Sequence, residues 1–104
     1  AIDSYENVLR VDNENIHALN NLSWLFSTCP QKDYRDAKKA LEYAVKALEQ
    51  KKEAFVFDTY AEALFINNDF QNAVVASKEA LLRSKDKKEY YKGQLQRFEK
   101  MLTN

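Results

Sequence analysis

The chain has 104 residues, and its 16 basic residues balance its 16 acidic ones, so no net charge favours nucleic acid or an anionic membrane. Apolar residues make up 45% of the chain, which is ordinary for a folded domain, whereas one Gly and one Pro argue against a β-sandwich or barrel. No apolar run reaches the length of a membrane span, and the single cysteine, Cys29, excludes an intramolecular disulfide.

Six helices are expected from the 3.6-residue spacing of apolar residues, and no segment shows the alternation of a strand. The first covers residues 1–11 and ends at the polar stretch DNEN. The second begins after Asn15, a suitable N-cap, and ends before Pro30, which cannot continue a helix. The residues expected to face the core are Ile2, Tyr5, Val8, Leu9, Ala18, Leu19, Leu22, Leu25 and Phe26.

The other four helices follow after short connections, which makes neighbouring helices antiparallel. The third is expected over about residues 34–50, and the fourth over about residues 53–66, ending in NND, where an Asn can adopt the left-handed conformation. Asp69 is expected to cap the fifth, residues 70–83, and Asp86 to cap the sixth. The expected core residues are Ala37, Leu41, Ala44, Val45, Leu48, Phe57, Tyr60, Ala61, Leu64, Tyr91, Leu95, Phe98 and Leu102.

Two stretches, ALEYAVKALEQ (residues 40–50) and NAVVASKEALL (residues 72–82), place small side chains at matching positions. Antiparallel helices approach closely where one of them presents small side chains to bulky ones on the other. A small–large pattern that recurs at a fixed spacing therefore predicts stacked helical hairpins. The matching pairs, each 33 residues apart, are Ala40 and Ala73, Ala44 and Ser77, and Ala47 and Ala80.

With these residues the chain resembles the tetratricopeptide repeat family, in which a helix–turn–helix unit of about 34 residues stacks into a superhelix. The clearest copy is AFVFDTYAEALFINNDFQNAVVASKEALL, and the copy before it is IHALNNLSWLFSTCPQKDYRDAKKALEYAVKALEQ, with a longer hairpin loop. Ser23 and Ala61 stand where the family usually has Gly, and no Pro follows the second helices. The resemblance implies an all-α fold of stacked antiparallel hairpins, a right-handed α-solenoid.

The resemblance covers nearly the whole chain as one domain. It assigns residues 1–15 to the second helix of a partial repeat, residues 16–52 and 53–84 to two repeats, and residues 85–104 to a C-terminal capping helix. Because the chain begins in mid-helix, we expect it to be the C-terminal part of a larger protein. The apolar face of residues 1–11 would then lack one partner here.

Catalysis and metal binding are not expected. Cys29 and His17 are the only thiol and the only imidazole, and they lie ~18 Å apart along one helix at 1.5 Å per residue. Asp58 and Glu62 lie one turn apart and could hold a cation weakly, but a solvated helix face is the favoured interpretation. A phosphate loop is not possible with a single Gly. We therefore expect no enzyme, no cofactor and no metal.

In the family, the first helix of each repeat lines a concave groove, so the resemblance implies that outward positions there contact another protein. Trp24 and Phe55 would anchor an apolar side chain, and Asp58 and Glu62 would favour a basic or amino-terminal group. Neither of these helices carries Lys or Arg, so capture of acidic chaperone tails is not expected. The groove residues are His17, Asn20, Asn21, Trp24, Thr28, Phe55, Asp58, Thr59, Glu62 and Ile66.

Other interpretations stay open. Trp24 could pack against the loop CPQKDYRD, and Asn21 could bond neighbouring backbone. The chain could be an architectural module that forms a homodimer through residues 1–11. The basic run RSKDKKEYYK (residues 83–92) could touch nucleic acid or acidic lipid, although Asp86 and Glu89 weaken that case. The partner protein is not identified, and the compartment is unknown, with the cytoplasm slightly favoured.

Overall fold

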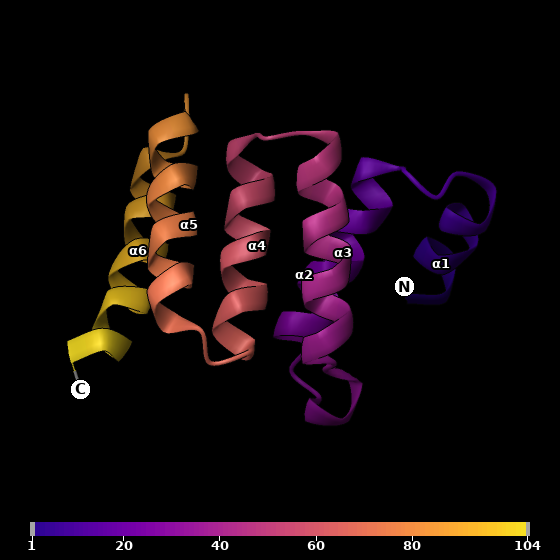
Figure 1. The fold of residues 1–104 in the computed structure, drawn as a ribbon, viewed down its shortest axis with the longest axis horizontal. Helices are drawn as coiled ribbons and strands as arrows, with labels where there is room; N and C mark the ends of the chain where they lie inside the picture. Colours follow the sequence, from indigo (N-terminus) through magenta and orange to yellow (C-terminus); the bar gives the residue numbers. More distant parts are fainter. Residues whose placement is uncertain (1, 104) are drawn as a thin grey trace.

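The computed structural model describes residues 2–103, and this part of the chain is all-α with six helices, as predicted (Figure 1). Residues 1 and 104, the ends of the first and last expected segments, lie outside the described residues. The helices are α1 (Ile2–Val11), α2 (Ile16–Thr28), α3 (Ala37–Gln50), α4 (Ala54–Ile66), α5 (Phe70–Arg83) and α6 (Lys88–Thr103), with a 3-10 turn, η1 (Lys32–Tyr34), between α2 and α3.

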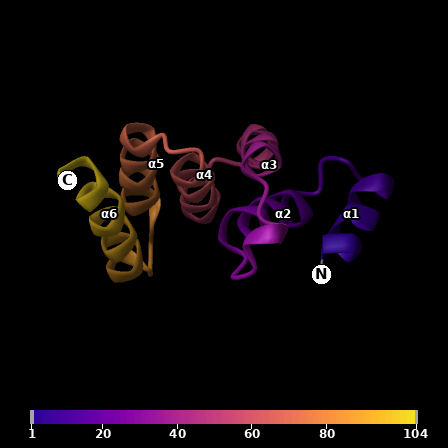
Figure 2. The same ribbon diagram turned by 90° about the horizontal axis from the view of Figure 1, so that it is seen from below.

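The helices form a row in chain order, with α1 and α6 at opposite ends (Figures 1 and 2). Each helix from α1 to α5 packs against the next one, and α2 also packs against α4, and α4 against α6. The row measures 41 × 32 × 19 Å. Contacts between nearest and next-nearest helices are what stacked hairpins produce, so the fold is repeat-like rather than a bundle around one closed core.

Small side chains lie where neighbouring helices meet, as the repeated pattern predicts. The side chains of Ala40, Ala44 and Ala47 on α3 are fully buried, and so are those of Ala73 and Ala80 on α5. Because these methyl groups occupy little space, the neighbouring helices approach closely. The hydroxyl of Ser23 on α2 even donates to the carbonyl of Ala40 on α3, at 2.7 Å.

The helix starts follow from local hydrogen bonds, and two differ from expectation. Asn15 and Asp69 accept from backbone amides of the first turns of α2 and α5, at 3.0 and 3.3 Å, as predicted. The third helix begins at Ala37 rather than near residue 34, because Asp36 provides its N-cap after the 3-10 turn. Before α6, the Lys87 amide donates to the hydroxyl of Ser84, so the expected capping role of Asp86 is corrected.

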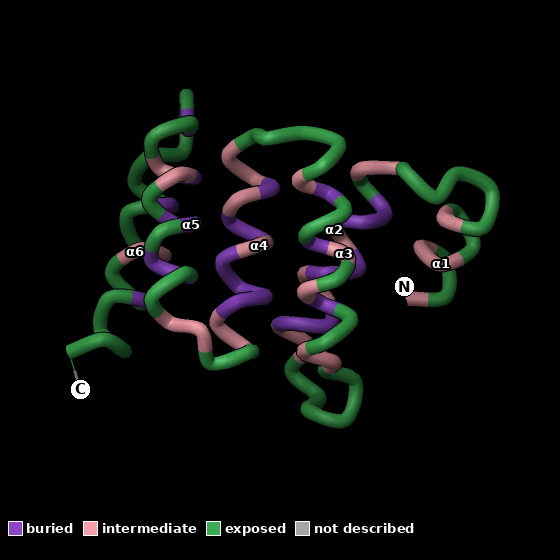
Figure 3. Tube along the Cα trace, in the orientation of Figure 1, coloured by how far each residue is buried: buried purple, intermediate pink, exposed green. Residues whose placement is uncertain are grey.

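The expectation that an Asn ends the fourth helix in the left-handed conformation is confirmed at Asn68, whose φ is 63°. Three expected core residues are wrong, since Val8, Val45 and Leu102 are 41, 43 and 47% exposed. Val8 and Leu102 lie on the two terminal helices, each of which has a neighbour on one side only. Figure 3 shows the same trend, with buried stretches along α2 to α5 and none in α1.

Candidate functional site

A hollow of about 400 Å³ lies where α2, α4 and α6 come together. In Figure 2, α2 and α6 lie on one side of the row, whereas α3 and α5 lie on the other. The hollow therefore belongs to the face formed by the first helices of successive hairpins and by the terminal helix. It is lined by Trp24, Ser27, Thr28, Arg35, Glu62, Phe65, Ile66, Tyr90, Gln94 and Arg97.

Four of the ten residues predicted for a groove share this hollow. Trp24 and Thr28 lie one turn apart on α2, and Glu62 and Ile66 lie one turn apart on α4, so each pair projects from one face of its helix. The hydroxyl of Thr28 donates to the carbonyl of Trp24 at 2.7 Å. Side chains from two hairpins thus meet at one place.

The other predicted residues of α2 and the start of α4 lie elsewhere. His17 is exposed in the first turn of α2, and Asn20 and Asn21 are half-buried. Phe55 packs against the buried cluster that contains Leu19, at the far end of α4 from the hollow. Pairing of the two Asn side chains with a peptide backbone stays a prediction.

Asp58, Thr59 and Glu62 are only 5, 3 and 5% exposed, so the expectation that they form an open groove wall is corrected. The side-chain amide of Gln94 on α6 donates to Asp58 at 3.1 Å and to Glu62 at 3.2 Å. Arg97, one turn further along α6, forms an ion pair with Glu62. The two carboxylates are neither on a solvated face nor free for a cation, because α6 already occupies them.

Burial shifts the pKa values of Asp58, Tyr90 and Arg97 in this polar cluster. It raises the pKa of Asp58, and hydrogen bonds from Gln94 and Tyr90 and the charge of Arg97 oppose the rise only in part. Burial, followed by the negative charge of Asp58, raises the pKa of Tyr90 to about 12. Burial also lowers the pKa of Arg97, which the charge of Asp58 opposes. Tyr90 therefore stays a neutral hydroxyl at ordinary pH.

The sequence reasoning missed six residues of the hollow, three of them on α6. Tyr90, Gln94 and Arg97 follow one another at helical spacing beside the apolar stripe of Tyr91 and Phe98. These three side chains are hydrogen-bond donors, and Arg97 is a cation, so the stripe complements the two carboxylates one turn apart on α4. This match of donors to acceptors is the signal that could have placed α6 here. The other missed residues are Ser27, Arg35 and Phe65.

Aromatic rings hold Arg97 in place. Its guanidinium lies 5.2 Å from the ring centre of Phe65 and 4.5 Å from that of Phe98. Cations at such distances over an aromatic face are attracted by the ring quadrupole. Arg35 reaches the hollow from the segment after η1, and its Nε donates to the carbonyl of Cys29 at 2.6 Å. Two guanidinium groups therefore border the hollow.

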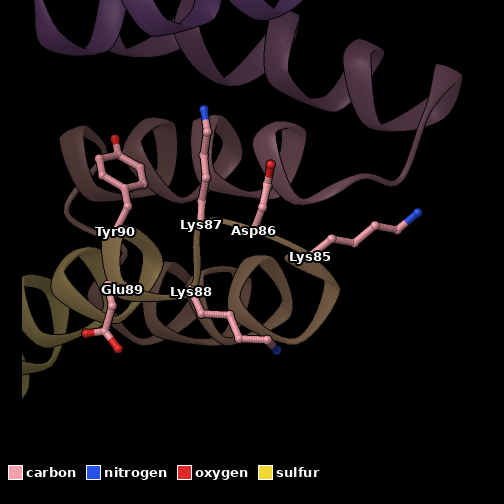
Figure 4. Close-up of a pocket in the computed structure, with 6 residues that line it drawn as sticks. All are labelled: Lys85, Asp86, Lys87, Lys88, Glu89 and Tyr90. Carbon is pink, nitrogen blue, oxygen red and sulfur yellow. The ribbon is translucent and has the colours of Figure 1, made fainter.

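A second hollow is lined by the start of α6 and the residues before it, from Lys85 to Tyr90 (Figure 4). In this close-up the ammonium groups of Lys85, Lys87 and Lys88 point away from one another, and in the chain Asp86 lies between the first two and Glu89 follows the third. Converging cations are what binding a phosphate requires. This geometry gives the nucleic-acid interpretation no support.

Residues 2–103 contain no cluster of three or more His, Cys, Asp and Glu side chains that could bind a metal ion. Within the same residues, no helix has the length and apolar character needed to cross a membrane. The fold and the hollow thus define a repeat-like helical domain with a partly apolar face. Comparisons with models of protein families, with curated proteins and with solved structures found no match to this chain.

Proposed function

We propose that this chain is a non-catalytic scaffold of the tetratricopeptide type, which binds a segment of another protein along the face formed by α2, α4 and α6. The observation that carries the proposal is the hollow in which Trp24 and Thr28 of one hairpin meet Glu62 and Ile66 of the next. The family assignment is supported by the fully buried alanines that recur 33 residues apart on α3 and α5.

Magnitudes indicate what kind of partner this face suits. Trp24, Phe65 and Ile66 give the hollow apolar walls, and burying one apolar side chain there contributes about 1.5–3 kcal/mol. A micromolar complex requires about 8 kcal/mol. The partner must therefore extend beyond the hollow, along α2, where the half-buried Asn21 carries an amide donor and acceptor.

The distribution of reactive groups supports a non-catalytic role. His17 lies in the first turn of α2, and Cys29 follows the last residue of the same helix, so the two cannot form a nucleophile–base pair. The buried carboxylates of Asp58 and Glu62 accept from Gln94, and Glu62, which lines the hollow, is also held in an ion pair by Arg97, so neither is placed as a free general acid.

The test is partner capture by variants of the whole chain. Trp24→Ala and Asn21→Ala are expected to weaken capture of proteins from an extract, with helical content unchanged by circular dichroism. Val75→Ala is the matched control, because Val75 is 60% exposed on α5, the outer side of the row. If both substitutions leave the amount of captured protein unchanged, the proposed binding face is wrong. It is also wrong if Val75→Ala weakens capture as much as Trp24→Ala and Asn21→Ala do.

A second candidate function is self-association through α1. No residue of α1 is buried, and Val8 and Val11 are 41 and 92% exposed at the open end of the row. Such exposed valines favour a contact with a second copy of the chain. Residue 1, which belongs to the expected interface of residues 1–11, lies outside the described residues. Sedimentation equilibrium should then show a dimer that Val11→Lys dissociates. A monomer at all concentrations would contradict this role.

A further inference from the structure

One hydroxyl of the hollow has no partner. Ser27 is 7% exposed, and its Oγ neither donates nor accepts a hydrogen bond. Its neighbour Thr28 bonds back to the carbonyl of Trp24, which is the usual way in which a helical hydroxyl is satisfied. Buried polar groups nearly always have partners. Of the three buried side-chain atoms without one in residues 2–103, only the Ser27 hydroxyl belongs to a residue that lines the hollow, and this combination points to a group that is supplied from outside.

The charges exposed in the hollow are positive. The side chain of Arg97 is 44% exposed, whereas that of its partner Glu62 is 7% exposed. Arg35 is exposed as well, and only one of its donors is used, for the carbonyl of Cys29. An arriving segment therefore meets two guanidinium groups, while the carboxylates lie beneath Gln94 and Arg97.

A basic side chain would have to displace Arg97 to reach these carboxylates. Such a displacement would also remove the guanidinium from the rings of Phe65 and Phe98. An acidic group needs no displacement, because both arginines keep free donors. The expectation from the sequence that the partner carries a basic group is thus disfavoured by the geometry.

We propose that the hollow binds a peptide segment in which an apolar side chain adjoins an acidic residue, and this inference rests on the proposed function. The apolar group packs on Trp24, Phe65 and Ile66. The carboxylate pairs with Arg35 and Arg97, and a polar group of the segment hydrogen-bonds to the hydroxyl of Ser27. These contacts specify the chemistry of the partner.

Three capped dipeptides test the proposal: N-acetyl-Leu-Glu-amide, N-acetyl-Leu-Gln-amide and N-acetyl-Leu-Lys-amide. Trp24 is the only tryptophan, so its fluorescence reports directly on the hollow. Such short probes should bind in the millimolar range. The Glu probe is expected to bind about fivefold more tightly than the Lys probe, since partly exposed ion pairs contribute little each.

Two variants separate the contacts. Arg35→Gln should lower the preference for the Glu probe at least about twofold, with Arg10→Gln on α1 as the control. Ser27→Ala should weaken all three probes without lowering the melting temperature, because its hydroxyl has no partner in the free protein. Ser77→Ala is the matched control: this hydroxyl on α5 is also buried and unpaired, but it does not line the hollow.

The outcomes of these measurements show separately whether the acidic preference or the proposed binding of peptides fails. If the Lys probe binds as tightly as the Glu probe, the acidic preference is overturned and the binding face remains. If no probe changes the Trp24 signal at about 20 mM, well above the millimolar range expected of one anchor, the hollow does not bind peptides and both fail. If Ser27→Ala and Ser77→Ala behave alike toward the probes, the role of the Ser27 hydroxyl is wrong.

Discussion

The ion pair between Arg97 and Glu62 should stabilise the contact of α6 with α4 more than an exposed ion pair does. Removing one partner of a fully buried pair costs about 3–5 kcal/mol. Here Arg97 is 44% exposed, and Gln94 continues to donate to Glu62. We therefore expect Arg97→Met to lower the free energy of unfolding by about 1–2 kcal/mol, close to the value of a hydrogen bond to a charged group.

Arg83 and Glu79 provide a matched comparison. The side chain of Arg83 is also 44% exposed and also lies over an aromatic ring, 5.0 Å from the centre of Phe57, but its partner Glu79 is 40% exposed. Double-mutant cycles with Arg→Met and Glu→Gln should give a coupling of about 1 kcal/mol for the pair between α6 and α4 and about 0.3–0.5 kcal/mol for the pair within α5.

Urea denaturation followed by circular dichroism measures both cycles, and a loss of 1 kcal/mol should lower the melting temperature by about 4–8 °C in a chain of this size. Equal coupling energies for the two pairs would refute the reasoning, because burial of Glu62 would then contribute nothing. A coupling near zero for Arg97 and Glu62 would show that α6 does not hold this position over α4.

Two further predictions concern the core and its protonation. Burial raises the pKa of Asp58, so its contribution to stability is fully present below its unfolded pKa and is lost as pH rises through the folded one. Asp58→Asn should therefore raise the free energy of unfolding at pH 7, and this gain should shrink as the pH falls through the raised folded pKa and be absent below pH ~4, the usual pKa of Asp; a gain independent of pH would contradict the assignment. Ala73→Leu should cost about 1–3 kcal/mol in urea denaturation, because Ala73 is fully buried in the cluster that α5 forms with Ala61 and Leu64 of α4, whereas Val75→Leu at an exposed site should be neutral; equal effects would contradict the packing.

Features encoded locally or by periodicity could be predicted from the sequence. The caps at Asn15 and Asp69 require only a side chain and an amide three residues on, and the buried alanines of α3 and α5 repeat at a fixed spacing. The start of α3 was wrong because Asp36 was not recognised as its cap, and the preceding residues form a 3-10 turn instead.

Which side chains of the candidate site are buried depends on contacts between residues that lie far apart in the sequence, and these contacts could not be predicted. Asp58 and Glu62 meet Gln94 over separations of 36 and 32 residues, and only the packing of α6 against α4 determines that meeting. The groove positions were implied by the resemblance to the repeat family, which concerns the first helix of each hairpin, α2 and α4, and not α6. Because the terminal helix covers part of that face, the hollow contains only four of the ten predicted groove residues and is bordered by Arg97.

The central claim is that partners bind in the hollow between α2, α4 and α6. Site-specific photo-cross-linking tests it most directly, with Ile66→p-benzoylphenylalanine in the hollow and Val75→p-benzoylphenylalanine on the outer side of the row. We expect the variant at position 66 to cross-link to captured proteins and the variant at position 75 to give no adduct. Adducts at position 75 with none at position 66 would place the partner on the opposite face and contradict the claim.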